Sequence, residues 1–164
     1  MNEGRFWQLI DETRAEADGD LERHAELLED RLADEEPAAV AEFDRLFRQK
    51  RADAYRWDVW AAAYVINGGC SDDCFEYFRN YVISLGRERF EATLRDPDSL
   101  AEIEIAEDPE AESLGYAALA AYERAAGDEM PLSDPFTPDQ PAGNAWDEDD
   151  VASVVPRLAE KYDW

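Results

Sequence analysis

The chain has 164 residues, of which 41 are acidic and 16 basic, and its formal net charge is −25. This length and a hydrophobic content of 45% suffice for one domain with a buried core, and 12% aromatic residues argue against an intrinsically disordered chain. The charge argues against direct binding to nucleic acid or anionic lipid, which need clustered lysine and arginine, and no stretch approaches the roughly 18–20 apolar residues of a membrane span.

Helical periodicity dominates the first 53 residues. Asn2 is a candidate N-cap of a first helix, Gly19 separates this helix from a second one, and Pro37 predicts the first turn of a third. Arginines occupy the outer face of the third helix. The apolar stripes of the three helices are Phe6, Leu9, Ile10 and Thr13, then Leu21, Ala25, Leu28 and Leu32, then Val40, Phe43, Leu46 and Phe47.

Residues 57–66, WDVWAAAYVI, are apolar on nearly all sides, so we expect the most buried helix of the protein here. The Asn-Gly-Gly sequence at 67–69 ends this helix, and Ser71 is the expected N-cap of the next one, which stops at Gly86. A short helix around Phe90 follows.

An acidic and looser segment then leads to a helix over 114–125. Four prolines predict an extended loop before a final helix that starts near Asp147 and is kinked by Pro156. The sequence therefore predicts an all-α, single-domain bundle of about seven to nine helices. Its parts are a helical domain over 1–127, a Pro-rich acidic loop over 128–146, and a C-terminal helix over 147–164 that packs back on the domain.

The acidic excess is concentrated in the last 69 residues, which hold 19 acidic and three basic side chains. One interpretation is a solvated surface or an adaptation to a saline habitat. A second is an acidic face that attracts a basic partner by electrostatic steering, and a third is mimicry of the DNA backbone.

The junction over 67–79 is a candidate ligand site, because a glycine-linked break between apolar helices can present backbone N–H groups and side chains. Its polar side chains are Asn67, Ser71, Asp72, Asp73 and Arg79. The alternative is a tight helix–helix corner. In that case the asparagine and the glycines adopt positive φ, the serine caps a helix, and the aspartates complement its dipole.

Cys70 and Cys74 have C-x-x-x-C spacing, whereas redox pairs are usually C-x-x-C and a zinc site needs further ligands. His24 is the only histidine, and its neighbours Arg23 and Glu26 favour a surface position. We therefore expect buried, unreactive thiols in a reduced cytoplasmic protein, with no metal and no cofactor. The N-terminal sequence lacks the basic-then-apolar pattern of a secretory signal. No nucleophile or carboxylate pair stands out, which favours a non-enzymatic role without deciding it.

Arg56, Trp57, Asp58 and Trp60 form a dense aromatic and charged cluster at the start of the apolar helix. Such residues are typical of an interface hot spot. They are equally typical of an anchor at the edge of the core, with Asp58 paired to an arginine.

Three blocks of the chain resemble a bacterial family of unknown function, domain-of-unknown-function 4240. These blocks are RFWQLIDETR near the start, 55–100 in the middle, and GYAALAAYERAAGDE; the ending WDEDDVASVVPRLAEKYDW resembles the tail of family members. The resemblance implies a compact, soluble bacterial protein without an assigned activity, so no catalytic residue is carried over. Members often have glycine at the position of Cys74, which argues against a functional cysteine pair. Together with the junction, the resemblance directs attention to Trp57, Asp58, Asn67, Gly68, Gly69, Ser71, Asp72, Asp73 and Arg79.

These observations favour a small acidic cytoplasmic protein that binds a macromolecular partner, as a regulator or as an immunity or inhibitor protein would. We expect the partner to be a protein, and a basic one, rather than nucleic acid or a membrane. The alternative is a small-molecule-binding protein or enzyme that uses the Asn67–Arg79 junction. The sequence does not indicate the oligomeric state.

Overall fold

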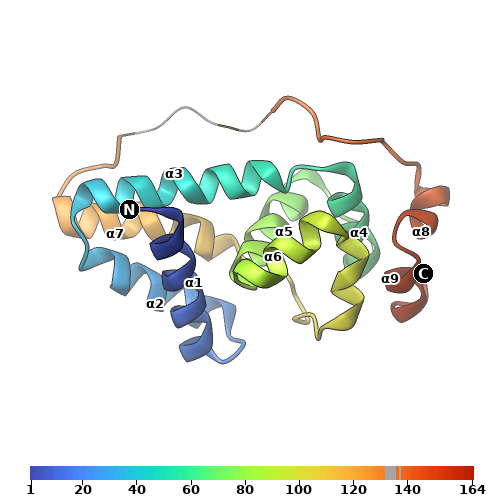
Figure 1. Cartoon of the computed structure of the whole chain (residues 1–164), viewed down its shortest axis with the longest axis horizontal. Coiled ribbons are helices and arrows are strands. Elements are labelled where there is room, and N and C mark those ends of the chain that lie inside the picture. The colour runs from blue at the N-terminus through green and yellow to red at the C-terminus, as the bar shows by residue number, and fades with distance from the viewer. Residues whose placement is uncertain (132–135, 137) are drawn as a thin grey trace.

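A computed structural model describes residues 1–131, 136 and 138–164 of the chain (Figure 1). Within these residues the protein is all-α and forms a single domain, as predicted, and its only β-type pairing is an isolated bridge between Arg56 and Ala142. The helices are α1 (Glu3–Ala17), α2 (Leu21–Ala33), α3 (Pro37–Asp53), α4 (Trp57–Asn67), α5 (Asp72–Ser84), α6 (Arg87–Arg95), η1 (Pro97–Glu102), α7 (Glu112–Ala126), η2 (Glu148–Asp150), α8 (Val151–Val154) and α9 (Pro156–Lys161).

Local capping chemistry sets the starts of several helices. The side chain of Asn2 accepts the backbone N–H of Arg5 at 2.9 Å, and Pro37 lies at the first position of α3. Ser71 accepts the N–H of Cys74 at 3.2 Å and caps α5. These three starts were expected from the sequence, because a cap depends on residues within one turn of the helix.

The core of the helical domain lies between α1, α2, α3, α5 and α7, with α2 and α7 forming the most extensive helix pair. Aromatic rings from α1, α3 and α6 fill the part of this core around α1. Phe6 packs on Phe43 with 4.8 Å between ring centroids, and Trp7 packs on Phe90 at 5.3 Å. The expected apolar stripes of the first three helices are buried or nearly so in this core.

The most buried helix is α5, so the expectation that 57–66 holds this position is wrong. Every residue of 78–84 is buried, including Arg79, Asn80 and Ser84. In α4 the aromatic residues Trp57 and Trp60 are only half-buried. The reason is position: α5 packs against α1, α3, α6 and α7, whereas α4 lies near one end of the molecule (Figure 1).

The C-terminal helices α8 and α9 pack on α4, and α9 also packs on η1. They lie at one end of the molecule, and the C-terminal end of α7 lies at the other (Figure 1). Pro156 does more than kink a single helix: Val155, with φ −131° and ψ 66°, separates α8 from α9. The 3-10 helix η1 lies in the acidic segment for which no regular helix is expected from the sequence. Its residue Asp98 accepts the backbone N–H groups of Arg157 at 3.0 Å and Leu158 at 2.9 Å, and so caps α9 from 60 residues away.

None of the helices in the described residues is long and apolar enough to cross a membrane.

Candidate functional site

The turn between α4 and α5 is a tight corner built on two glycines. Gly68 has φ 68° and Gly69 has φ 118°, and both donate their N–H groups to the carbonyl of Tyr64. These positive φ angles agree with the corner interpretation of the sequence. Asn67, expected to share them, does not; it is the last residue of α4.

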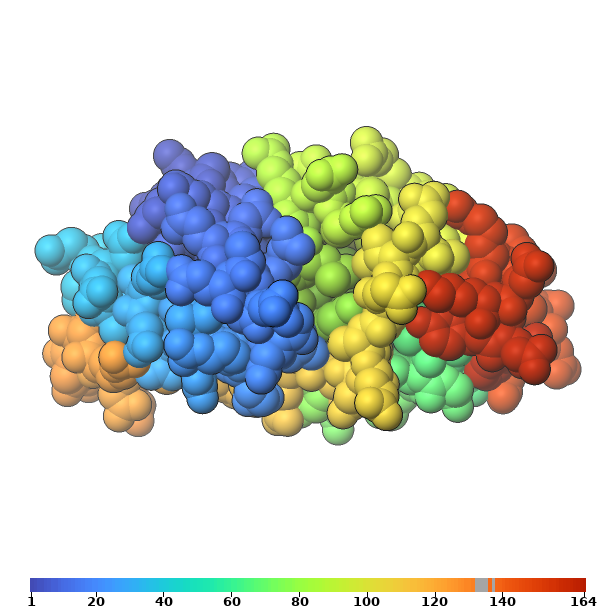
Figure 2. Space-filling view, turned by 90° about the horizontal axis from the view of Figure 1, so that it is seen from below, coloured from blue at the N-terminus to red at the C-terminus, as the bar shows by residue number. Residues whose placement is uncertain are grey.

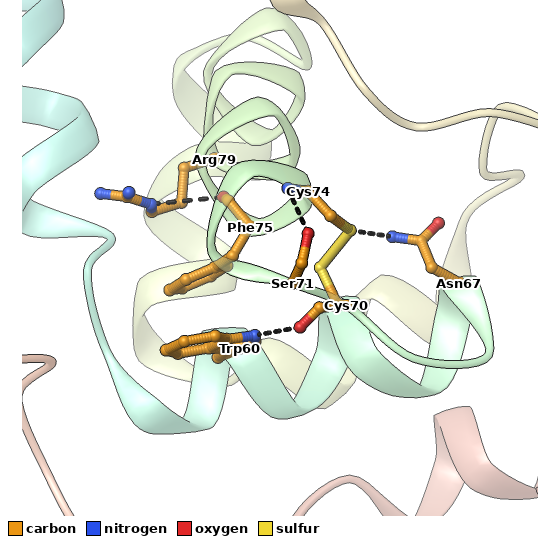
Figure 3. Close-up of a disulfide and its surroundings, with 7 residues drawn as sticks. All are labelled: Trp60, Asn67, Cys70, Ser71, Cys74, Phe75 and Arg79. Atoms are coloured by element: carbon orange, nitrogen blue, oxygen red, sulfur yellow. Dashed lines mark hydrogen bonds between the residues drawn. A yellow bond between two sulfur atoms is a disulfide. The ribbon is translucent and has the colours of Figure 1, made fainter.

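A disulfide joins Cys70 and Cys74, with 5.4 Å between their Cα atoms (Figure 3). The expectation of reduced, unreactive thiols is therefore wrong. The two residues flank the N-cap Ser71, and the first turn of α5 brings their side chains together. The spacing alone did not indicate the bond, because it depends on the backbone conformation at the helix start.

The polar groups of the corner pair with one another, as Figure 3 shows. The indole Nε1 of Trp60 donates to the carbonyl of Cys70 at 3.0 Å. The amide of Asn67 donates to Sγ of Cys74 at 3.4 Å. Of the side chains expected to face a ligand, Asn67 and Ser71 are therefore used in closing the corner.

Asp72 and Asp73 are exposed in the first turn of α5 and form no ion pair within the described residues. Negative charge at this position complements the helix dipole. Both aspartates therefore have a structural explanation at the helix start, as the corner interpretation expected.

Arg79 lies away from the sulfur atoms, on the α3 side of α5 (Figure 3). Its side chain is 5% exposed and stacks over the rings of Tyr55, at 4.6 Å, and Phe75, at 4.8 Å. It donates to the carbonyls of Phe75 at 3.3 Å and Arg51 at 3.0 Å. Burial, and to a smaller extent the charge of Arg51, lower the pKa of Arg79 to about 10. The guanidinium thus joins α3 to α5 and does not line the junction.

A stack of three aromatic rings connects the start of α4 to α5. Trp57 lies on Trp60 with 5.5 Å between ring centroids, and Trp60 lies on Phe75 at 4.7 Å. Trp146 meets Trp57 edge-on and donates its Nε1 proton to the Trp57 carbonyl at 2.6 Å. The stack anchors the segment that precedes the C-terminal helices.

Asp58 forms a bidentate ion pair with Arg56, at 2.7 and 2.9 Å, and also accepts a hydrogen bond from the backbone N–H of Val59. The structure thus brings Trp57 to the corner through Trp60, and it places Asp58 and Arg79 outside the corner. Asn67, Gly68, Gly69 and Ser71 do meet there, as a packed turn.

The expectation of a surface position for His24 is wrong, because His24 is only 2% exposed. Its spacing contained the signal: His24 lies three residues after Leu21 and four before Leu28, on the buried stripe of α2. The residue lines a cavity of about 440 Å³ together with Tyr81 and Ser84. Burial lowers the pKa of His24 to about 4.

The second feature that the sequence did not single out is Tyr116, whose side chain is 56% exposed on α7. It borders three hollows of the surface, one against α2, one against α3 and α5, and one beside Met130. Six glutamates line these hollows with it: Glu22, Glu26, Glu29, Glu112, Glu123 and Glu129. Arg48 and Arg51 also line the hollow against α3 and α5, where they pair with Asp44 and Glu76. We call Tyr116 and these six glutamates the α2/α7 face. No group of three or more potential metal ligands occurs in the described residues.

A model of the DUF4240 family, described as a protein of unknown function, matches residues 1–124, about three quarters of the chain. The chain belongs to the DUF4240 family. The match covers α1 to α6, η1 and nearly all of α7, so the corner, the His24 cavity and most of the α2/α7 face belong to the DUF4240 part. The resemblance of the tail to family members lies outside the match and stays a prediction. No curated protein and no solved structure matches the chain.

Proposed function

We propose that this DUF4240 protein acts by binding a basic protein partner through the α2/α7 face. The observation that carries the proposal is an exposed aromatic side chain, Tyr116, that borders three hollows lined by six glutamates. Exposed tyrosines are typical anchors of protein interfaces. Carboxylates around such an anchor attract lysine and arginine and repel phosphate, which favours a basic protein over nucleic acid.

The distribution of charge supports the same proposal. Eleven of the 16 basic side chains form ion pairs within the described residues. Arg124 pairs with Glu29 and Asp30 of α2, and Arg157 with three carboxylates around η1. Because most of the cations are engaged internally, most of the charge offered to a partner is carboxylate.

The carboxylates of the face differ in how far they are engaged. Glu22 accepts the hydroxyl of Ser113, and Glu112 accepts that of Tyr77 at 3.0 Å, which raises the pKa of Tyr77 to about 12. Glu123 and Glu129 are exposed, and neither forms an ion pair within the described residues. These four keep their negative charge available, because a hydroxyl donor does not neutralise it.

The experiment is affinity capture from a lysate of the source organism at low and moderate salt, followed by binding measurements with the purified captured protein. We expect a basic protein whose affinity falls steeply with salt, because exposed charges are screened beyond about 10 Å at 0.1 M. Tyr116→Ala removes the anchor and is expected to weaken binding by tenfold or more. Val154→Ala, which shortens another exposed apolar side chain, is the matched control.

Net charge and the position of charge are separated by two triple variants that remove three negative charges each. The first variant changes the α2/α7 face and combines Glu22→Gln, Glu123→Gln and Glu129→Gln. The second changes exposed residues outside the face and combines Asp139→Asn, Asp147→Asn and Asp149→Asn. The proposal requires that only the first set weakens binding strongly. Equal effects of the two sets, or full affinity of the Tyr116→Ala variant, would contradict it.

A further inference from the structure

The cavity beside His24 lies between four segments of the chain. These are the C-terminal end of α1, the turn into α2, the C-terminal end of α5, and residues 104–106 between η1 and α7. In Figure 2 the yellow 104–106 region lies beside the blue α1–α2 region, and the green of α5 is visible between them. Its volume of about 440 Å³ is within the range of small-molecule sites.

The walls combine apolar surface with hydrogen-bonding groups. Ala15, Leu21, Leu85 and Ile105 contribute apolar surface, while His24, Tyr81 and Ser84 contribute polar atoms. An apolar enclosure with a few polar groups is the usual composition of a ligand pocket.

The polar atoms retain unused hydrogen-bonding capacity. The Tyr81 hydroxyl oxygen accepts the N–H of Ala106 at 3.1 Å, and no acceptor for its own proton occurs among the described residues. Ser84 donates to the carbonyl of Tyr81 at 2.6 Å, which leaves its oxygen able to accept. Nε2 of His24 has no partner in the described part of the chain, a rare state for a buried polar atom, but it is shielded from solvent and is not itself offered to a ligand.

Charge around the cavity is predominantly negative. Asp18, Asp20 and Glu104 line it, and Arg14 is the only permanent cation among the described residues of the lining. Burial keeps the imidazole of His24 neutral at neutral pH, so it adds no positive charge. The lining therefore favours a positively charged ligand over an anion.

We propose that this cavity binds a small organic amine, with its apolar body inside and its ammonium group at Asp18 and Glu104. The two hydroxyls of the wall complement further polar atoms of the ligand, and the His24 ring forms part of the wall. This site is separate from the α2/α7 face, and each proposal stands or falls on its own experiment.

The experiment uses the full chain and tryptamine, which has a flat apolar body and one ammonium group. Indole-3-propionate has the same ring system and a carboxylate in place of the amine, and serves as the comparison. Because His24 is the only histidine, its ring signals in an NMR spectrum report on the cavity alone. We expect tryptamine to shift these signals saturably, with a dissociation constant in the millimolar range or below, and indole-3-propionate to leave them unchanged.

Two charge variants test the role of the rim. Asp18 has φ 50°, a conformation that asparagine tolerates, so Asp18→Asn with Glu104→Gln removes two charges while keeping the backbone. Asp163, with φ 53°, and Glu160 lie at the other end of the chain, and the same pair of changes there is the matched control. We expect the first pair to weaken tryptamine binding about fivefold, as typical of partly exposed charges, and the second to have no effect.

A steric variant tests the location. Ala15 is exposed on α1 and lines the cavity, so Ala15→Trp narrows it without changing the core, and Ala38→Trp on α3 is the control. Binding is expected to be lost in the first and kept in the second. The proposal is overturned by equal shifts with the two ligands, by absence of saturable binding, or by unchanged binding in the Ala15→Trp variant.

Discussion

Replacing His24 with leucine should make the protein less sensitive to mild acid. The ring is buried against α1, α5 and the segment around Glu104, and the charge of Arg14 acts on its pKa. Burial is the main cause of its low pKa, and the hydrogen bond to the Ile10 backbone opposes it. Leucine has a similar volume and removes both the titration and the unpaired Nε2.

The magnitude follows from the difference in pKa between the two states. The folded value is about 4, against an ordinary value of 6.5 in the unfolded chain. The unfolded state therefore takes up the proton first, and stability falls as the pH drops below 6.5, down to about 4. Between pH 7 and pH 5 this linkage removes about 2 kcal/mol from the free energy of unfolding of the wild type. The leucine variant lacks this contribution.

Urea unfolding followed by tryptophan fluorescence at pH 7 and pH 5 measures the effect, because the chain has five tryptophans. Carboxylates titrate in both proteins alike, so the difference between the two losses isolates His24. His24→Gln, which does not titrate and stays polar, provides a second variant if leucine impairs folding. Parallel losses of stability, within about 0.5 kcal/mol, in the wild type and in the folded variants would refute the argument.

Three further predictions concern the contacts that hold the helices together. Reduction of the disulfide should lower the free energy of unfolding by about 2 kcal/mol, the chain-entropy value for so short a loop. Chemical denaturation with and without dithiothreitol measures this loss, and the Cys74→Ser variant should show no effect of dithiothreitol. Arg79→Lys should lower the free energy of unfolding by about 2–3 kcal/mol, because a lysine side chain cannot stack on Tyr55 and at the same time donate to the carbonyls of Phe75 and Arg51. A melting temperature equal to that of the wild type would count against the stacking argument. Asp98→Ala should uncap α9 at a cost of about 1–2 kcal/mol and speed proteolytic release of the C-terminal helices, and an unchanged cleavage rate would show that the cap is dispensable.

The features that the sequence predicted correctly depend on short stretches of chain. The cap at Asn2, the proline at the start of α3, and Ser71 before α5 act within one helical turn. Apolar spacing located the first three helices, and the glycines at 68 and 69 located the corner. For the same reason the corner interpretation succeeded at these positions.

The candidate site was harder to predict because its residues were judged by their neighbours in sequence. Asp58 and Arg79 lie within a short stretch around the junction, yet one pairs with Arg56 and the other faces α3. The neighbours Arg23 and Glu26 favour a surface position for His24, whereas its spacing to Leu21 and Leu28 places it on the buried side of α2. A side chain on a helix is buried according to the face it occupies, which adjacent residues do not reveal.

By itself, the sequence determined the helical class, most helix boundaries, the family and the excess of negative charge. Only the tertiary structure decided that α5 is the most buried helix, that Asp98 caps α9, and that His24 borders a cavity. The physical reason is the distance along the chain over which each effect acts. Helix propensity and capping act over about four residues, whereas burial, remote capping and cavities depend on which elements pack together across the whole chain.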